Sequence, residues 1–539
     1  MRSQYRLMLA VFFLAGFATV KAENEVTKWN ELTLQIIKEA VVSPPKTSRD
    51  LAIVHTSIYD SVNSIEQTYT PIYAPWQPDA ESLNKDVAIA AAAHRALSLL
   101  YPAFQTTLDT ALTETINAQT SQDYITESLA LGENVADIII AWRNTDGWDS
   151  ESDYTYDDTT LGKWRPTPPN YAPPLEPQWG DVEPFAIDDA NNFMPPAPPA
   201  LTSPEYAVAL NEVKDLGAID STTRTADQDE IAEFWNDFPG NTAAPAGKWN
   251  SITQEVITQF NLSLIETARL FALLNLSLAD AGTVSWKAKY EYDLWRPIDA
   301  IRLADTEGNP YTTADLDWEP NWPTPPFPEY VSGHSTFSSS GAKMLELILG
   351  TNQISFTISA GFDVLPGVTR SYTSLWQAAE EAGMSRIYGG IHFQFGNIEG
   401  LNCGENISID VHDNWCLDKP CDLNRDASID YSDIIHMGTE WLAINDRNDK
   451  VFSDINYDGQ VDYIDFILLS KKLQWQVNTT DLKENTIVSQ KEISKLSDDL
   501  LTNEPAIIGD INSDNIVNIA DYSIFAQNWL SDSSAALIV

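Results

Sequence analysis

Three short segments carry residues that together could bind and act on a tetrahedral oxoanion. The segments are Lys289–Pro297, Ser332–His334 and Arg386–His392, and they supply three cations, a serine hydroxyl, a glycine amide and two imidazoles. A guanidinium donates two parallel hydrogen bonds to an oxoanion, and an imidazole exchanges protons near neutral pH. Because the chain has 78 Asp and Glu against 32 Lys and Arg, such a grouping of cations predicts a site.

The first segment must be positioned by a helix. Lys289 and Arg296 are seven residues apart, or two helical turns, which predicts that they share one face. Pro297 cannot continue a helix without loss of a hydrogen bond, so we expect the helix to end or kink there.

The other two segments sit where helices are expected to begin or end. Ser332-Gly333-His334 follows a proline-rich loop and precedes a predicted helix from Thr336 to Leu349. Free amides at a helix N-terminus form a natural cradle for an anion. Gly389-Gly390 predicts a turn or helix end that brings Arg386 and His392 to one centre.

From about Glu23 to Asp413 the chain reads as helices joined by long loops. Apolar residues recur at helical spacing in residues 86–100 and 253–292, whereas strand patterns are scarce. Prolines are dense between residues 164 and 199, which predicts extended coil with a binding or shielding role. His55 and His94 lie in apolar helical stretches, so we interpret them as packing residues; His412 and His436 are interpreted as incidental.

Composition excludes some functions and indicates a compartment. Hydrophobic residues make up 43% of the 539 residues, enough for a sizeable core, and the net charge of −46 disfavours binding to nucleic acid or anionic membranes. Residues 1–22 resemble a secretory signal, with Arg2 and Arg6 before an apolar stretch, so we expect a soluble, exported protein. Cys403, Cys416 and Cys421 are too few for a disulfide scaffold, although one disulfide among them is plausible.

Three acidic twelve-residue loops follow the helical region, and each precedes a helical pattern. Oxygen ligands at positions 1, 3, 5, 9 and 12, with the backbone carbonyl of position 7, match the way one turn of chain surrounds Ca²⁺. Gly459 permits the sharp turn in the second loop. The predicted ligands are Asp422, Asn424, Asp426, Ser428, Asp430 and Asp433 in the first loop, Asp454, Asn456, Asp458, Gln460, Asp462 and Asp465 in the second, and Asp510, Asn512, Asp514, Ile516, Asn518 and Asp521 in the third. The alternative interpretation is a set of solvated acidic loops.

An Asp at position 12 with one helix after it resembles the dockerin type I repeat. The resemblance implies a calcium-folded pair of loop–helix units at residues 416–476, a linker at 477–505 and a third unit at 506–532. In that family the paired module docks onto a cohesin, so a cohesin-like scaffold partner and surface tethering are expected.

The order Lys-x6-Arg-Pro, Ser-Gly-His and Ser-Arg-x5-His resembles the vanadium-dependent haloperoxidases and the type 2 phosphatidic acid phosphatase superfamily. The resemblance covers roughly residues 25–410, and the surroundings of Trp286 and Phe327 are similar to the chloroperoxidase branch. It implies a mainly α catalytic domain at residues 23–415, built as two four-helix bundles with the site at one end. It also implies vanadate as cofactor, with hydrogen peroxide, a halide and an organic acceptor as substrates.

The resemblance assigns a role to each residue of the constellation. His392 would bond vanadium and His334 would be the acid–base catalyst. Trp286 and Phe327 would line the halide pocket, although both could equally be core aromatics. The residues expected to hold the equatorial oxygens are Lys289, Arg296, Ser332, Gly333 and Arg386, with Lys289 also polarising peroxide and Asp237 pairing with Arg386.

One position departs from the superfamily pattern. Asp often stands four residues after the ligand histidine, where it can orient the ring, whereas this chain has Gly396. Loss of such a partner typically costs about 10–100-fold in metal affinity or activity. Asn397 or a backbone carbonyl is the expected substitute.

Three functions are compatible with these patterns. The first is a secreted vanadate-dependent haloperoxidase that oxidises halide with hydrogen peroxide to hypohalous acid. The second is a phosphatase in which His392 attacks phosphorus and His334 protonates the leaving group. The third is a non-catalytic scaffold component.

Overall fold

The computed structural model describes residues 24–76, 80–360 and 364–415, together with seven single residues of the C-terminal region: 436, 437, 453, 455, 461, 465 and 469. The predicted signal peptide, the linker, the third calcium loop and most of the first two loops lie outside these residues.

Helices dominate the described residues, which confirms the predicted mainly α fold. The longer helices are α1 (Glu25–Ala40), α2 (Pro44–Glu66), α3 (Lys85–Leu100), α4 (Gln105–Ala118), α5 (Ile125–Arg143), α6 (Pro204–Leu216), α7 (Ala226–Phe234), α8 (Ala244–Ile257), α9 (Leu264–Tyr292), α10 (Pro297–Arg302), α11 (Gly333–Leu349), α12 (Leu375–Tyr388) and α13 (Gln394–Trp415). One antiparallel hairpin, β1 (Phe356–Ser359) with β2 (Thr369–Tyr372), pairs Phe356 with Tyr372.

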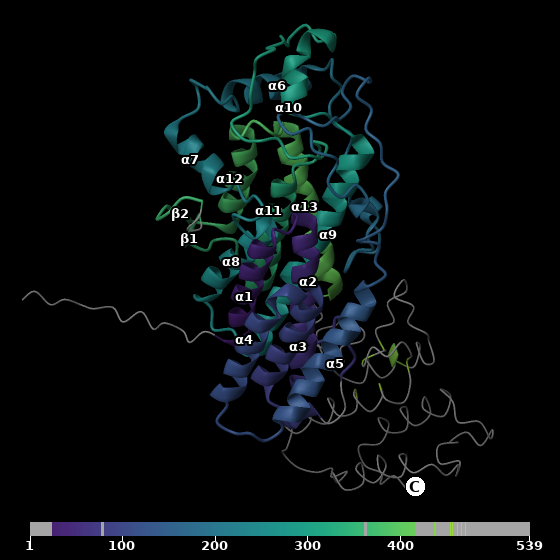
Figure 1. Cartoon of the computed structure of the whole chain (residues 1–539), viewed down its shortest axis with the longest axis vertical. Helices are drawn as coiled ribbons and strands as arrows, with labels where there is room; N and C mark the ends of the chain where they lie inside the picture. The colour runs from purple at the N-terminus through teal and green to yellow at the C-terminus, as the bar shows by residue number, and fades with distance from the viewer. Residues whose placement is uncertain are drawn as a thin grey trace, which may run out of the picture.

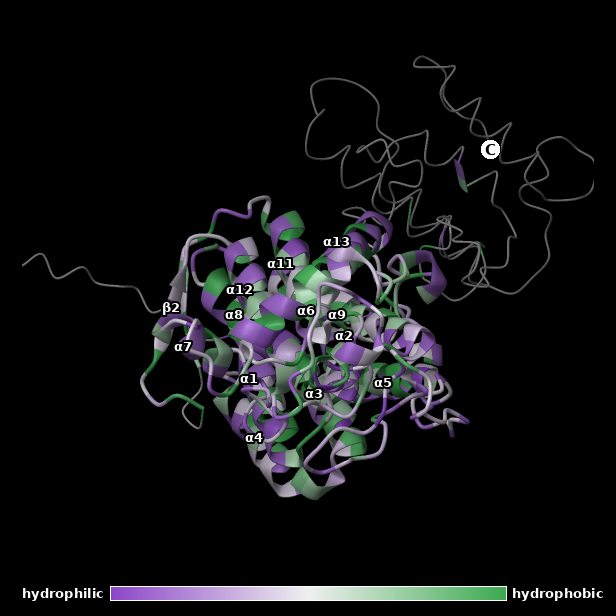
Figure 2. Ribbon diagram, turned by 90° about the horizontal axis from the view of Figure 1, so that it is seen from above, coloured by the Kyte–Doolittle hydropathy of each residue, from purple (hydrophilic) through white to green (hydrophobic). Residues whose placement is uncertain are grey.

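The long helices form two groups that share α9. Helix α2 packs against α3, α5 and α9, and α11 packs against α12, α13 and α9. Figure 1 shows α3, α4 and α5 toward one end of the molecule and α6 and α10 at the other. Seen along the long axis, hydrophilic and hydrophobic segments alternate along the helices, as amphipathic helices around a core require (Figure 2).

Helix α9 is the central element. Its 29 residues begin at a capping box between Ser263 and Glu266, and nearly all of its faces are buried. A helix buried on all sides needs apolar residues all round, which the sequence from Ala268 to Ala281 supplies. Because α9 contacts both helix groups, its C-terminal end is held firmly where Trp286 and Lys289 lie.

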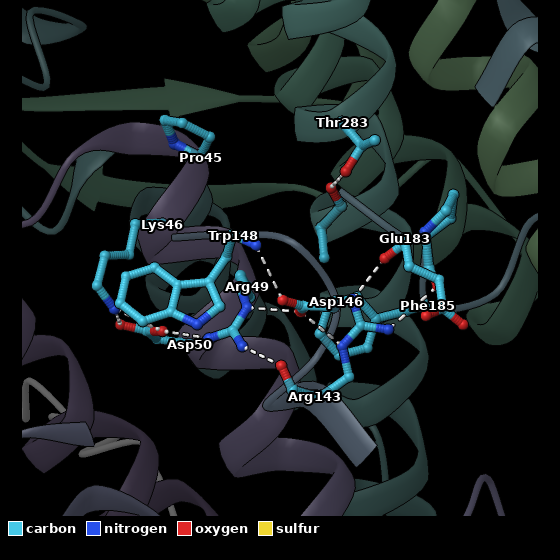
Figure 3. Close-up of polar contacts among 12 residues, drawn as sticks. Pro45, Lys46, Arg49, Asp50, Arg143, Asp146, Trp148, Glu183, Phe185 and Thr283 are labelled. Atoms are coloured by element: carbon cyan, nitrogen blue, oxygen red, sulfur yellow. Dashed lines mark hydrogen bonds and ion pairs between the residues drawn. The ribbon is translucent and has the colours of Figure 1, made fainter. Parts of the chain in front are cut away.

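The proline-rich region from 164 to 199 is extended coil apart from two short 3₁₀ helices, as predicted. A buried polar network fixes the neighbouring coil onto α2 and α5 (Figure 3). Asp146 accepts hydrogen bonds from Arg49 and Arg143, both 2.8–2.9 Å long. Asp280 of α9 accepts the backbone N–H groups of residues 185–187. The coil is therefore anchored at main-chain atoms as well as through side chains.

The predicted helix boundary at Pro297 is wrong. Helix α9 ends at Tyr292, and Asp293 follows in the left-handed conformation at φ 55°. Arg296 therefore does not share a helical face with Lys289; it is the extended N-cap residue of α10, in which Pro297 is the first residue. A proline at the first helical position lacks only an N–H that would have no partner, so it starts a helix here.

The packing histidines lie as interpreted. His55 is fully buried, stacks on Phe271 at a ring-centroid distance of 5.0 Å and contacts Asn30 Oδ1 at 2.9 Å. His94 is half-buried in α3 and lies 2.8 Å from Asp109. No helix among the described residues is both long and apolar enough to cross a bilayer.

Candidate active site

Lys289 and Arg296 reach one loop from two different elements. Lys289, in the last turn of α9, donates to the carbonyl oxygens of Glu329 at 3.2 Å and of Val331. Arg296 donates from Nε to the Phe327 carbonyl and from Nη1 to that of Ile391, both at 2.8 Å. The predicted convergence of the two cations is thus achieved by the loop that precedes α11.

These cations are held in an unfavourable environment. Lys289, Arg296 and Arg386 have side chains that are almost completely buried. Burial lowers the pKa of Arg296 to about 9 and of Arg386 to about 10, and it lowers that of Lys289 well below its usual value. Repulsion by Arg386 adds to the effect at Arg296, and repulsion by Arg296 adds to it at Lys289. Such a site favours an anionic ligand.

Ser332, Gly333 and His334 start helix α11, so the predicted helix begins three residues earlier than expected. The N–H of Ser332 donates to the Gly396 carbonyl at 3.0 Å, and its hydroxyl accepts from the Ser335 N–H at 3.4 Å. His334 lies in the first turn, where its buried Nε2 has no hydrogen-bond partner. Burial, and then repulsion by Arg386, lowers the His334 pKa well below its usual value, which favours the neutral imidazole.

A turn brings Arg386 and His392 together, as predicted. Helix α12 ends at Tyr388, and Gly390 follows at φ +76°. A Cβ on Gly390 would lie 2.2 Å from the Gly217 carbonyl oxygen, so only glycine fits. His392 then points its Nε2 at Arg296 Nη1, 3.2 Å away.

Glu329 is a site residue that the sequence did not reveal. Its Oε1 lies 2.8 Å from His392 Nδ1 and accepts the Phe393 N–H at 3.0 Å. Burial raises the pKa of the Glu329 carboxyl, whereas the Phe393 N–H and then Arg296 and Lys289 favour its charged form. A Glu in a proline-rich loop gives no signal of contact with a histidine 63 residues later.

Asp237 lies at the edge of the site, at φ 48° and buried. Burial raises its carboxyl pKa, while the charges of Lys248 and then Arg386 favour ionisation. Arg386 Nη1 donates to the carbonyl oxygens of Trp235 and Asn236, at 3.0 and 3.3 Å. The role of Asp237 as partner of Arg386 stays a prediction, and Lys248 is a further buried cation that the sequence analysis missed.

Trp286 and Phe327 form an aromatic wall beside the cations. Their ring centroids are 5.1 Å apart at an interplanar angle of 46°. Lys289 Nζ lies 5.0 Å and the Arg296 guanidinium 4.8 Å from the Phe327 centroid, within the range of cation–π attraction. Trp286 Nε1 donates to the carbonyl of Leu175 at 3.4 Å, so the proline-rich coil closes this wall from outside.

The donor set fits a tetrahedral oxoanion. Arg296 Nη2 and Arg386 Nε are buried without a partner, as is His334 Nε2. Buried polar groups are rarely left unpaired, and those that remain so indicate a missing ligand or a functional role. Three cations against the carboxylates of Glu329 and Asp237 leave an excess of positive charge for an anion to neutralise.

The predicted calcium loops lie almost entirely outside the described residues. Asp465, at position 12 of the second loop, is buried and accepts the Ile455 N–H at 2.6 Å. Val461 and Leu469 are also buried. Cys403 is a free, buried thiol in α13.

Comparison with known proteins agrees with this geometry. Residues 269–415 match the family described as the VCPO second helical-bundle domain, and residues 420–474 match the dockerin type I domain. The vanadium chloroperoxidase of Curvularia inaequalis is 23% identical over 488 residues, which cover 69% of this chain and 79% of that protein.

Solved structures extend the likeness to the whole helical region. A bacterial vanadium-dependent iodoperoxidase superimposes with a TM-score of 0.65 at 28% identity, over 72% of this chain and 96% of that chain. The holo form of a bacterial vanadium-dependent chloroperoxidase gives a TM-score of 0.58 at 17% identity, over 73% of this chain and 97% of that chain, and shows the fold alone.

The chain is similar to the vanadium haloperoxidases, and this similarity supports an enzyme of that type. The resemblance stated from the three motifs is thereby confirmed, as are the helical-bundle fold and the dockerin segment. The match to the VCPO second helical-bundle domain begins within α9 and ends with α13, so the matched residues contain every motif of the oxoanion site.

Proposed function

We propose that the protein oxidises a halide with hydrogen peroxide to hypohalous acid, using vanadate held by residues at the end of α9, the start of α11 and the end of α12. One observation carries the proposal: three buried cations act on the two imidazoles, and Arg296 and Arg386 each keep a buried N–H group without a partner. A charged oxoanion would satisfy these donors and relieve their mutual repulsion.

The residues that would hold vanadate are those of the constellation. His392 Nε2 would bond the vanadium, and the N–H groups of Arg296 and Arg386 would donate to its oxygens. Lys289, with Ser332 and Gly333 at the start of α11, would complete the cradle. Bound vanadate is a Lewis acid that activates hydrogen peroxide toward attack by halide. The protein's own part is to fix these donors beforehand, so that charge is stabilised without reorganisation.

His334 would move the proton. Burial and then Arg386 lower its pKa, which favours the neutral imidazole, and its Nε2 has no partner. A neutral imidazole accepts the proton that hydrogen peroxide loses on binding, and the imidazolium returns it as the product leaves. Carbonyl oxygens of Asn236 and Trp235 favour the charged form and so assist this cycle.

The halide would bind beside the aromatic wall. Trp286 and Phe327 exclude water next to Lys289, whose charge attracts an anion into the space. Dry surroundings strengthen that attraction because water no longer screens it. Hydrogen peroxide and an organic acceptor are the remaining substrates.

The C-terminal segment would anchor the enzyme outside the cell. Dockerin type I similarity at residues 420–474 supports calcium binding and a cohesin-like partner. The buried Asp465 at position 12 is in keeping with a loop that closes around a cation. With the signal-like residues 1–22, this suggests a secreted, tethered oxidant source.

The test is halogenation of a β-diketone dye by the purified full chain with hydrogen peroxide and iodide, bromide or chloride. Reactions with and without orthovanadate are run beside a phosphate-ester hydrolysis control. Vanadate-dependent halogenation is expected and ranks the halides. Ester hydrolysis that vanadate inhibits, without halogenation, would instead assign a phosphatase with His392 as nucleophile. Inactivity in both assays would indicate a scaffold component.

A further inference from the structure

The position four residues after His392 is glycine, and the space beside it is filled from another segment. Gly396 lies in the first turn of α13. A Cβ built on Gly396 would lie 2.5 Å from Glu329 Oε1 and 3.0 Å from Oε2. No side chain at 396 fits while Glu329 is there, so the glycine and the glutamate depend on each other.

Glu329 contacts His392 at Nδ1, whereas Arg296 contacts the other ring nitrogen. Its Oε1 lies 2.8 Å from His392 Nδ1, while the Phe393 N–H donates to the same oxygen at 3.0 Å. The glutamate is completely buried, so no water competes for these bonds.

The two neighbours of the imidazole select one tautomer. Arg296 Nη1, 3.2 Å from His392 Nε2, can only donate, so Nε2 must present its lone pair. The proton of a neutral ring then resides on Nδ1 and is donated to Glu329. Because a metal bonds the unprotonated nitrogen, this tautomer keeps the lone pair on Nε2, the nitrogen that would bond vanadium.

We propose that Glu329 is the positioning residue of His392. Because Gly396 has no side chain, it leaves room for a carboxylate to reach Nδ1 from the loop before α11 instead of from α13. This deepens the proposed function, since it rests on His392 as the vanadium-bonding residue. Glu329 holds the ring orientation and tautomer, and it stands next to the Ser332 loop that also donates to the Gly396 carbonyl. These contacts therefore connect His392 to the Ser332 segment that would bind the anion.

The experiment uses the full chain and moves the carboxylate that contacts His392 from position 329 to position 396. The variants are Glu329→Ala, Gly396→Asp and the double variant Glu329→Ala/Gly396→Asp. Asp60→Asn removes an equally buried carboxylate that also accepts main-chain N–H groups, but from residues 72–74, and serves as the matched control. Glu329→Leu fills the same space without an acceptor and replaces Glu329→Ala if that variant does not fold.

Two readouts need no turnover. Nitrogen-15 NMR of histidine-labelled, vanadate-free protein reports the tautomer of His392, and isothermal titration with orthovanadate reports its Kd. A protein that binds vanadate but does not halogenate would sink the proposed function and leave this test intact.

We expect the Nδ1–H tautomer in the wild type and in Asp60→Asn. Glu329→Ala should shift the tautomer and weaken vanadate binding by about 10–100-fold. Gly396→Asp alone should also weaken binding, because its side chain collides with Glu329, and the double variant should recover most of the lost affinity. An unchanged tautomer and a Kd within twofold of wild type in Glu329→Ala or Glu329→Leu, or a double variant no better than the singles, would overturn the proposal.

Discussion

Replacing Arg386 by Met should leave the stability of the vanadate-free protein nearly unchanged while it weakens oxoanion binding. Burial lowers the pKa of the Arg386 guanidinium from its ordinary value to about 10. At about 1.4 kcal/mol per pKa unit, the charged form costs the folded state about 3 kcal/mol. This cost is present in full below pH 10 and is lost only as the pH rises toward the ordinary pKa of arginine, so a measurement at pH 7 includes all of it.

The substitution also removes two hydrogen bonds, to the carbonyl oxygens of Trp235 at 3.0 Å and Asn236 at 3.3 Å. Bonds from a charged donor contribute about 1.5–3 kcal/mol each, and the longer one falls at the low end. The gain and the loss therefore cancel to within about 1–2 kcal/mol. Vanadate binding loses a charged donor without any such compensation, so the Kd should rise about 10–100-fold.

Arg143→Met is the matched control, since this arginine is equally buried but fully paired. Arg143 bonds Asp146 at 2.9 Å and the carbonyl of Pro184 at 3.2 Å; Figure 3 shows Arg143 between Asp146 and Glu183. Breaking a buried pair costs about 3–5 kcal/mol, and Arg49, which still contacts Asp146, keeps the loss near the lower limit. Urea unfolding and calorimetric vanadate titration measure both variants. If Arg386→Met were destabilised as much as Arg143→Met, or bound vanadate like wild type, the assignment of Arg386 to the anion would be wrong.

Three further outcomes are expected. His334→Ala should lower kcat for halogenation about 10²–10⁴-fold, with a much smaller change in vanadate Kd, because it removes the proton acceptor; equal losses in both would contradict that role. Removing calcium with EGTA should abolish cohesin-type binding and leave halogenation unchanged, and Asp465→Ala should lose one calcium site in a titration. Burial raises the pKa of Asp60 from 3.8 to about 7. Ionisation of Asp60 should therefore reduce the free energy of unfolding progressively between about pH 4 and 7, and by a constant amount above pH 7. Asp60→Asn should remove this pH dependence of the free energy of unfolding.

The sequence predicted the helices and most of the site because those signals are local. Ser332 is both the N-cap of α11 and part of a contiguous motif, and the turn at Gly390 requires a residue that tolerates positive φ. Seven-residue spacing between Lys289 and Arg296 was misread, because periodicity does not show where a helix ends. The residues still meet, since the loop around Phe327 supplies acceptors to both cations.

What the sequence could not predict depends on contacts between distant segments. Glu329 reaches His392 across 63 residues, and Lys248 approaches Asp237 from α8. Neither contact can be inferred from a regular spacing of residues in the sequence. The missing Asp at Gly396 pointed to a replacement, and the expected substitutes were Asn397 or a carbonyl. Asn397 Oδ1 instead accepts the Ser335 hydroxyl at 2.8 Å, on the side of α13 that packs against α11.

The acidic surface and the cationic pocket act over different distances. A net charge of −46 repels halide and vanadate at long range, but at physiological salt that repulsion is screened beyond about 8 Å. Lys289, Arg296 and Arg386 are buried, so salt screens them far less. Their lowered pKa values mean that these buried charges oppose folding, and an anion that binds only the folded state would recover part of that free energy. The recoverable free energy is mainly the cost of burying the three charges, and repulsion between like charges adds to it at Lys289 and Arg296.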